Sequence, residues 1–166
     1  MKQVVAPRIL HIATHGFFLQ NSEALSGNPL VRSGLALSNA NLRASGTDDG
    51  ILTALEASGL NLWGAKLVVL SACDTGVGEV RDGEGVYGLR RAFVLAGAES
   101  LVMSLWQVSD YTTRQLMIGY YRNLKQGLGR GEALRQIQLD ILKKNPKLHP
   151  FYWANFIQAG EWANLD

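Results

Sequence analysis

The sequence predicts an α/β protein in which the buried strands of a parallel sheet are combined with amphipathic helices. Two runs indicate the strands: RILHIATHG (residues 8–16) and KLVVLSACDTGVG (residues 66–78) each contain continuous apolar, partly β-branched residues and end in a glycine-containing loop. Such runs are typical of strands that are buried on both faces. The third observation is that apolar residues recur at helical spacing in several other segments. These segments are 51–60, 84–96, 112–125 and 131–144.

The remaining elements follow in chain order. Residues 17–19 and 35–37 are short apolar pieces separated by the turn signals of Ser-Gly-Asn-Pro, which predicts a small hairpin. The helix over 51–60 is expected to end at Gly59, and the helix over 84–96 at Gly97. Two further strands are predicted, over 100–105 and 156–159.

Composition indicates one globular domain. The chain has 166 residues, of which 47% are hydrophobic and 18% charged, and its formal net charge is +2. Because the basic residues are scattered, nothing favours binding to nucleic acid. No signal peptide and no apolar run of membrane-spanning length is present. A single cysteine permits no internal disulfide, which fits a reducing compartment. We therefore expect residues 1–166 to form one cytoplasmic domain without membrane or nucleic-acid partners.

The single thiol, Cys73, lies where a predicted strand becomes a loop. In open α/β sheets, ligands bind in the crevice outside the carboxyl ends of the strands. Cys73 is therefore a candidate reactive residue. The alternative is that it acts as a small buried hydrophobic residue, which is common for lone cysteines. This stretch alone does not decide between the two.

A second strand, over residues 8–16, ends in a histidine followed by a glycine, His15 and Gly16. A histidine and a cysteine at the carboxyl ends of two parallel strands can face each other across the sheet. An imidazole can activate a thiol for nucleophilic attack and later protonate a leaving amine. Because glycine has no Cβ, a substrate carbonyl could approach the Gly16 N–H closely. Together with the N–H of Cys73, it could form an oxyanion hole.

Other chemistry at these motifs is disfavoured. The glycine-rich stretch after Cys73 lacks the Gly-Lys-Ser/Thr of a phosphate loop. Its Asp-Thr-Gly triplet would need a second copy to supply the paired carboxylates of an aspartic peptidase. His11 lies on a strand without the glutamate of a helical zinc motif, so we interpret it as structural. No metal and no organic cofactor is expected. The glycine-rich segment 74–84 has few apolar anchors, so an outside contact is expected to order it.

Several motifs in order resemble the CHAT domain, a bacterial branch of the clan of caspase-like cysteine peptidases. The resemblance rests on HIATHG, VVLSACDTG, GEGVYGLRRAFVLAGAESLVMSLWQVSD, GEALRQIQ and HPFYWANFIQAGE, and it runs from about Ile9 to Glu161. It implies a three-layer caspase-like fold, in which a mostly parallel central sheet is flanked by helices. It also implies that His15 and Cys73 are a catalytic dyad of a cysteine endopeptidase.

The resemblance further implies a substrate groove near the same strand ends. Ser104 and Trp106 match a segment that lines the groove in caspase-like enzymes, although packing is the more common role of a tryptophan at a strand end. Asp110 could cap the following helix or face the pocket. Ser71 stands where metacaspases have an acidic residue, two positions before the cysteine, so a strict preference for arginine or lysine is not expected.

The family pattern usually begins with a further strand and helices before the histidine strand, and this chain begins eight residues before Ile9. We therefore expect that an amino-terminal part of the domain is missing, which could favour pairing with another chain, including a homodimer. The expected partners are a protein or peptide substrate and an upstream sensor or repeat region that activates the domain. The alternative function is a catalytically inactive CHAT-fold module for protein interaction or regulation.

Overall fold

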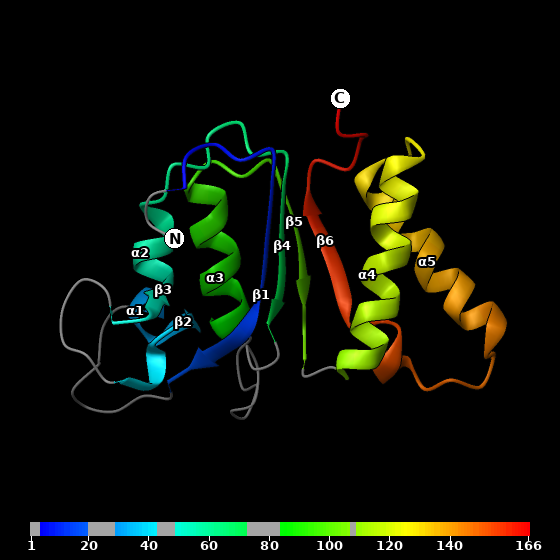
Figure 1. Cartoon of the computed structure of the whole chain (residues 1–166), viewed down its shortest axis with the longest axis horizontal. Coiled ribbons are helices and arrows are strands. Elements are labelled where there is room, and N and C mark those ends of the chain that lie inside the picture. Colours follow the sequence, from blue (N-terminus) through cyan, green and yellow to red (C-terminus); the bar gives the residue numbers. More distant parts are fainter. Residues whose placement is uncertain (1–3, 20–28, 43–48, 73–83, 107–108) are drawn as a thin grey trace.

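The computed structural model describes residues 4–19, 29–42, 49–72, 84–106 and 109–166, which are coloured along the chain in Figure 1. The strands in these residues are β1 (Ile9–Phe18), β2 (Ser33–Ala36), β3 (Ile51–Thr53), β4 (Leu67–Ala72), β5 (Ser100–Ser104) and β6 (Phe156–Gly160). The helices are α1 (Pro29–Arg32), α2 (Ala54–Ser58), α3 (Glu84–Leu95), α4 (Asp110–Lys125) and α5 (Arg130–Lys144), with the 3-10 helices η2 (Ala40–Leu42) and η3 (Pro150–Tyr152).

In the described part of the chain, six strands form one sheet in the order β3-β2-β1-β4-β5-β6. The three central strands β1, β4 and β5 are parallel to one another. The outer strands β2, β3 and β6 join them through antiparallel pairs. The predicted α/β fold, compatible with a caspase-like fold, is therefore confirmed, and the sheet is mixed because its parallel part is limited to the three central strands.

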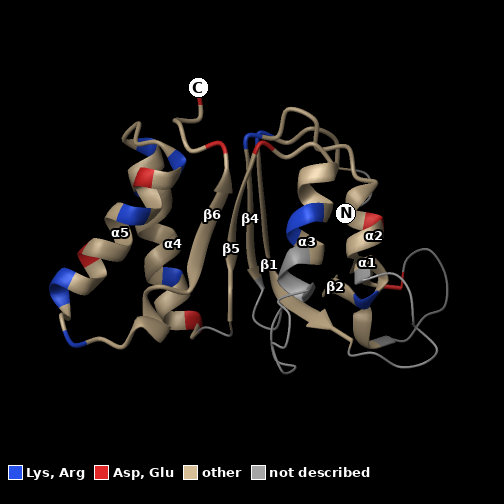
Figure 2. Ribbon diagram, turned by 180° about the vertical axis from the view of Figure 1, so that it is seen from behind, with Lys and Arg blue, Asp and Glu red and all other residues tan. Residues whose placement is uncertain are grey.

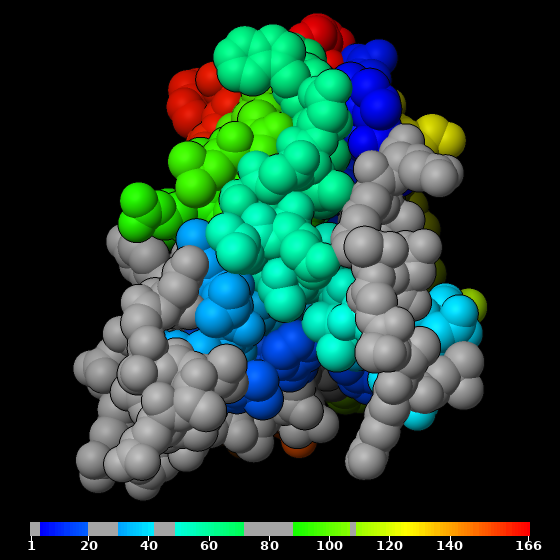
Figure 3. Space-filling model, turned by 90° about the vertical axis from the view of Figure 1, so that its left-hand side faces the viewer, coloured from blue at the N-terminus to red at the C-terminus, as the bar shows by residue number. Residues whose placement is uncertain are grey.

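Helices cover both faces of the sheet, which gives three layers (Figure 1). α1, α2 and α3 lie on one side, and α4 and α5 lie on the other. Figure 3 views the molecule from the side of α2 and shows α2 at the surface with α3 beside it. β4 faces both layers: Val68 and Leu70 belong to the core under α2 and α3. Leu67 and Val69 belong to the core under α4 and α5. The prediction that this strand is buried on both faces is thus confirmed.

The predicted helix over 51–60 is wrong at its start. Ile51–Thr53 form the edge strand β3, in which Leu52 pairs with Leu35 of β2. α2 begins only at Ala54, because Thr53 forms a capping box with Glu56: the Thr53 side chain accepts from the Glu56 N–H, and the Thr53 N–H donates to the Glu56 carboxylate. The predicted hairpin is present, since Phe17 of β1 pairs antiparallel with Gly34 of β2.

The charged residues that Figure 2 colours are distributed over several elements, and α5 carries both signs. This distribution agrees with the small net charge of +2. None of the helices in the described segments is long and apolar enough to cross a bilayer.

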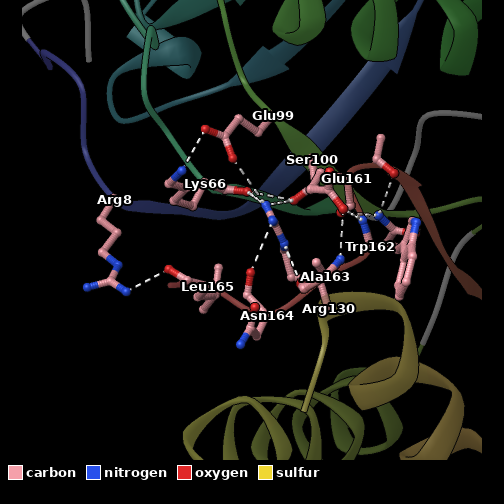
Figure 4. Close-up of polar contacts among 12 residues, drawn as sticks. Arg8, Lys66, Glu99, Ser100, Arg130, Glu161, Trp162, Ala163, Asn164 and Leu165 are labelled. Carbon is pink, nitrogen blue, oxygen red and sulfur yellow. Dashed lines mark hydrogen bonds and ion pairs between the residues drawn. The ribbon is translucent and has the colours of Figure 1, made fainter. Parts of the chain in front are cut away.

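A buried arginine joins the carboxyl-terminal tail to the amino ends of the central strands (Figure 4). The Arg130 side chain is 2% exposed. Its guanidinium donates to four oxygen atoms, those of the carbonyls of Lys66, Ala163 and Asn164 and of the hydroxyl of Ser100, at 2.6 to 3.3 Å. This cluster, which we call the Arg130 latch, fixes the tail on the sheet.

Two further contacts complete this end of the molecule. Glu99 is 3.6 Å from the Arg130 guanidinium and 2.9 Å from the Lys66 ammonium. These two cations lower the pKa of the Glu99 carboxyl, with the hydrogen bond from Lys66 as the largest cause. Arg8 donates to the carbonyl of Leu165 at 2.6 Å. The tail is therefore held by Arg130 of α5 and by Arg8 of the segment before β1.

The Arg130 latch makes a prediction about stability. Arg130→Met should lower the free energy of unfolding by about 3–5 kcal/mol, because it removes the four hydrogen bonds that a buried, charged donor makes to the tail and the strands. Urea unfolding measures this value. Arg135→Met is the matched control on the same helix: Arg135 pairs only with Glu132 of its own helix among the described residues, and both side chains are exposed. Equal stability of the two variants would contradict the role assigned to the latch.

A second prediction concerns Tyr120 on α4. This side chain is 0% exposed, and its hydroxyl has no hydrogen-bond partner among the described residues. Burial, the largest cause, raises the pKa of Tyr120 well above its usual value. Tyr120→Phe removes the unpaired hydroxyl and should keep or increase the free energy of unfolding by up to about 1 kcal/mol. A loss of more than that amount in urea unfolding would mean that the hydroxyl has a partner.

Candidate functional site

The carboxyl ends of β1, β4 and β5 lie at the same end of the sheet (Figure 1). Thr14 of β1 is opposite Ala72 of β4, and Leu70 of β4 is opposite Met103 of β5. The end of the molecule that carries the Arg130 latch lies at the other side. A ligand site in an open α/β sheet is expected where the parallel strands end, so this end is the candidate site.

The expectation that the first strand ends at His15 and Gly16 is wrong, because β1 continues to Phe18 through its pairing with β2. His15 directly follows the last residue of β1 that pairs with β4, and its side chain is exposed. Its backbone is fixed, because His15 also begins the antiparallel pairing with Ala36 of β2. Cys73 directly follows Ala72, the last residue of β4. Cys73 and the glycine-rich stretch to residue 83 lie outside the described residues, so the predicted dyad is described on the histidine side alone.

Two of the predicted substrate residues are neighbours in the sheet. Continuing the register of β4 and β5 by one residue places Ser71 opposite Ser104, and the two-residue alternation puts both on the face toward α4. Ser71 is 9% exposed and Ser104 is 1% exposed. Ser104 therefore does not present its hydroxyl at the surface of this structure.

The backbone of Gly16 has the direction that an oxyanion donor would need. Leu19 donates to the carbonyl of Arg32, so the hydrogen-bonded pairs between β1 and β2 fall on Phe17 and His15. Gly16 lies at a pair without ladder hydrogen bonds, opposite Leu35. Its N–H is consequently directed away from β2, toward the side on which β4 ends.

His11, interpreted from the sequence as structural, belongs to a polar network beside the site. Its Nε2 lies 3.2 Å from the Ser71 hydroxyl, and its Nδ1 lies 2.9 Å from the Tyr121 hydroxyl. Partial burial lowers the pKa of His11. Burial likewise raises the pKa of Tyr121 to about 12. A neutral imidazole thus connects β1, β4 and α4.

The other predicted site residues have mainly packing contacts. Trp106 donates from Nε1 to the carbonyl of Phe151 at 3.0 Å and stacks on the Phe151 ring at a centroid distance of 6.3 Å. Asp110 is exposed and is the first residue of α4, whereas Ser109 is the N-cap residue. The interpretation of Asp110 as the helix cap is therefore wrong by one position; its charge still lies in the first turn, where it interacts favourably with the helix dipole.

No group of three or more His, Cys, Asp or Glu side chains that could hold a metal ion occurs within the described segments.

The third histidine, His149, accepts a hydrogen bond at Nδ1 from the N–H of Phe151 and thereby caps η3, which is a structural role.

Sequence reasoning missed the network around His11. The signal for part of it is present, because His11 precedes His15 by four positions on the same strand and therefore shares its face. No sequence signal identifies Tyr121, since helical periodicity does not say which strand a helix residue will contact.

Comparison with known proteins identifies one family and two relatives. The sequence matches the CHAT domain family over residues 1–161. Tetratricopeptide repeat protein 28 of Homo sapiens is 32% identical over 116 residues, which cover 70% of this chain and 5% of that protein. The protein of the same name from Mus musculus is 31% identical over the same shares. The chain thus spans about one twentieth of the length of these curated relatives, and both relatives are mammalian, so they do not support the bacterial assignment. The chain belongs to the CHAT domain family, which is related to caspase-like cysteine peptidases.

Proposed function

We propose that the chain is a cysteine endopeptidase domain that cleaves peptide bonds through His15 and Cys73. The observation that carries the proposal is the register of the two central strands, in which Thr14 is opposite Ala72. His15 and Cys73 each directly follow one member of this pair along the chain, and adjacent strands are about 4.8 Å apart. A histidine and a cysteine that follow paired positions of neighbouring parallel strands have the order that a cysteine nucleophile and its imidazole need.

The reaction is acyl transfer. The thiolate of Cys73 attacks the carbonyl carbon of the peptide bond, and the carbonyl oxygen becomes an oxyanion. The N–H of Gly16, directed toward the end of β4, and the N–H of Cys73 would donate to that oxygen. The imidazolium of His15 gives its proton to the leaving amine as the C–N bond breaks. Water, deprotonated by His15, then hydrolyses the thioester and restores the thiol.

The substrate groove is proposed to run along the ends of β4 and β5. Its candidate residues remain Ser71, Ser104, Trp106 and Asp110. The buried hydroxyl of Ser104 would act from below the surface of the groove. Trp106 is held by Phe151, so its ring offers a fixed apolar surface. Asp110 is the exposed carboxylate nearest in sequence to that tryptophan and would favour a basic group on the substrate.

Regulation by a partner is part of the proposal. Both mammalian relatives are named for tetratricopeptide repeats, and the chain matches a small part of each. An upstream repeat or sensor region is therefore the proposed activating partner, and a homodimer is the other possible source of an activating contact. With a single cysteine among 166 residues, a reducing cytoplasm is the proposed compartment.

The dyad is tested by substitution. Cys73→Ala should abolish cleavage of a fluorogenic peptide library, and His15→Ala should lower kcat/KM by roughly 10³-fold or more, because the two residues act as a unit. His149→Ala is the matched histidine control and should retain the kcat/KM of the unmodified chain. Cleavage that survives in a pure Cys73→Ala preparation would refute the nucleophile assignment.

A second candidate is an inactive interaction module with the same fold. The name of the relatives favours it, since that name describes repeats and no peptidase. A peptide-based acyloxymethyl ketone, which labels a thiol only after an active peptidase site binds it, separates the two. Labelling of Cys73 that requires His15 supports the peptidase. Absence of labelling in the chain alone and in the chain joined to its activating region supports the interaction module.

A further inference from the structure

The His11 network lies directly beside the last pair of the β1–β4 ladder. Ala13 is opposite Ser71, and the ladder ends one residue later at Thr14 and Ala72. The imidazole of His11 reaches across from β1 to the Ser71 hydroxyl on β4, at 3.2 Å. The last backbone pair of two strands frays easily, so a side-chain bond at this position restrains the end of β4.

The direction of the hydrogen bonds can be deduced from the two hydroxyl groups. A phenol is more acidic than a serine hydroxyl, so it is the better donor and the poorer acceptor. This difference favours donation from Tyr121 to Nδ1 of His11, 2.9 Å away, which leaves the proton of the neutral imidazole on Nε2, 3.2 Å from the Ser71 hydroxyl. The ring of Tyr121 also packs on the His11 ring, at a centroid distance of 5.7 Å.

We propose that His11 is a positioning residue of the candidate site: held by Tyr121 in the Nε2–H tautomer, it ties Ser71, and with it the end of β4, to β1 and α4. This inference rests on the proposed function, because the chain leaves β4 at the candidate nucleophile. His11 touches neither the substrate nor the reacting atoms. It acts by restraining the end of β4, the strand from which the chain continues to Cys73.

Protonation of His11 would break the arrangement. Both ring nitrogens then carry hydrogen, so Nδ1 no longer accepts from the phenol. Besides Tyr121, the titratable groups on the elements around His11 are His15 on β1 and, on α4, Asp110, Tyr111, Arg114, Tyr120, Arg122 and Lys125; β4 has none. Partial burial lowers the pKa of His11, so the neutral form persists below the pH at which an ordinary histidine is half protonated.

The lowered pKa of His11 determines how stability changes with pH. The unfolded chain takes up a proton at His11 at higher pH than the folded chain does. The contribution of His11 is therefore fully present above pH ~6.5 and declines as the pH falls from ~6.5 to its lower folded pKa, below which it is constant. His11→Gln, which can donate but does not titrate in this range, should remove this part of the pH dependence.

Two measurements on the full chain test the proposal, and neither uses peptide cleavage. Long-range ¹H–¹⁵N NMR of the His11 ring should show the Nε2–H tautomer, and Tyr121→Phe should abolish that preference. The rate at which iodoacetamide alkylates Cys73 should fall about tenfold in Tyr121→Phe and in Ser71→Ala, because small displacements of reactive groups have large effects on rate. The variant that combines Tyr121→Phe with Ser71→Ala should be alkylated no more slowly than either single variant, since both changes act through His11.

Controls separate positioning from folding. Tyr120→Phe makes the same chemical change at the adjacent residue and should leave the alkylation rate unchanged. His11→Gln should restore most of the rate that His11→Leu loses. Each of four results would overturn the proposal. They are an Nδ1–H tautomer of His11, additive effects of Tyr121→Phe and Ser71→Ala, an unreactive thiol in the unmodified chain, and a His11→Leu variant with lower thermal stability but unchanged alkylation. A chain that passes these tests but cleaves no peptide, either alone or joined to its activating region, would refute the proposed function alone.

Discussion

The parallel pairing of β1 with β4 is the interaction on which the rest of the structure depends. β4 contributes to both hydrophobic cores, with Val68 and Leu70 on one face and Leu67 and Val69 on the other. A shift of its register by one residue would place each of these side chains in the wrong layer. The burial of β4 on both faces therefore fixes its alignment with β1. This pairing brings together chain segments that are almost sixty residues apart.

Accessibility at the site follows from how the helices are placed. The core under α4 and α5 is built on β4, β5 and β6, through Val69, Val102 and Phe156. On the same face of β1, the residues Ile9, Ala13 and His15 stay exposed, with Ile9 at 39%, and His11 is only partly covered, by Tyr121 of α4. On this face the sheet is thus closed over β4, β5 and β6 and open over β1, the strand that carries His15. This arrangement lets His15 combine a fixed backbone with a side chain that a ligand can reach.

Much of the fold could be predicted because its signals are local. The apolar runs of β1 and β4 and the spacing of α3, α4 and α5 were sufficient for these elements. The start of α2 could not be predicted from periodicity, because Ile51–Thr53 satisfies the helical spacing and only the pairing of Leu52 with Leu35 makes it a strand. At the candidate site, the sequence predicted that the strands before His15 and Cys73 are buried neighbours in a parallel sheet. It could not predict the buried position of Ser104 or the contact of Tyr121 with His11, because both depend on how distant elements pack.

The Arg130 latch and the candidate site occupy opposite ends of the same strands. The latch holds the amino ends of β4 and β5 and the tail, through Lys66, Ser100, Ala163 and Asn164. Substitutions among the residues that follow β4 and β5 leave every one of these bonds in place. Evolution can therefore exchange the chemistry of a CHAT domain without first having to rebuild its scaffold, so active and inactive descendants of one ancestor can share this architecture.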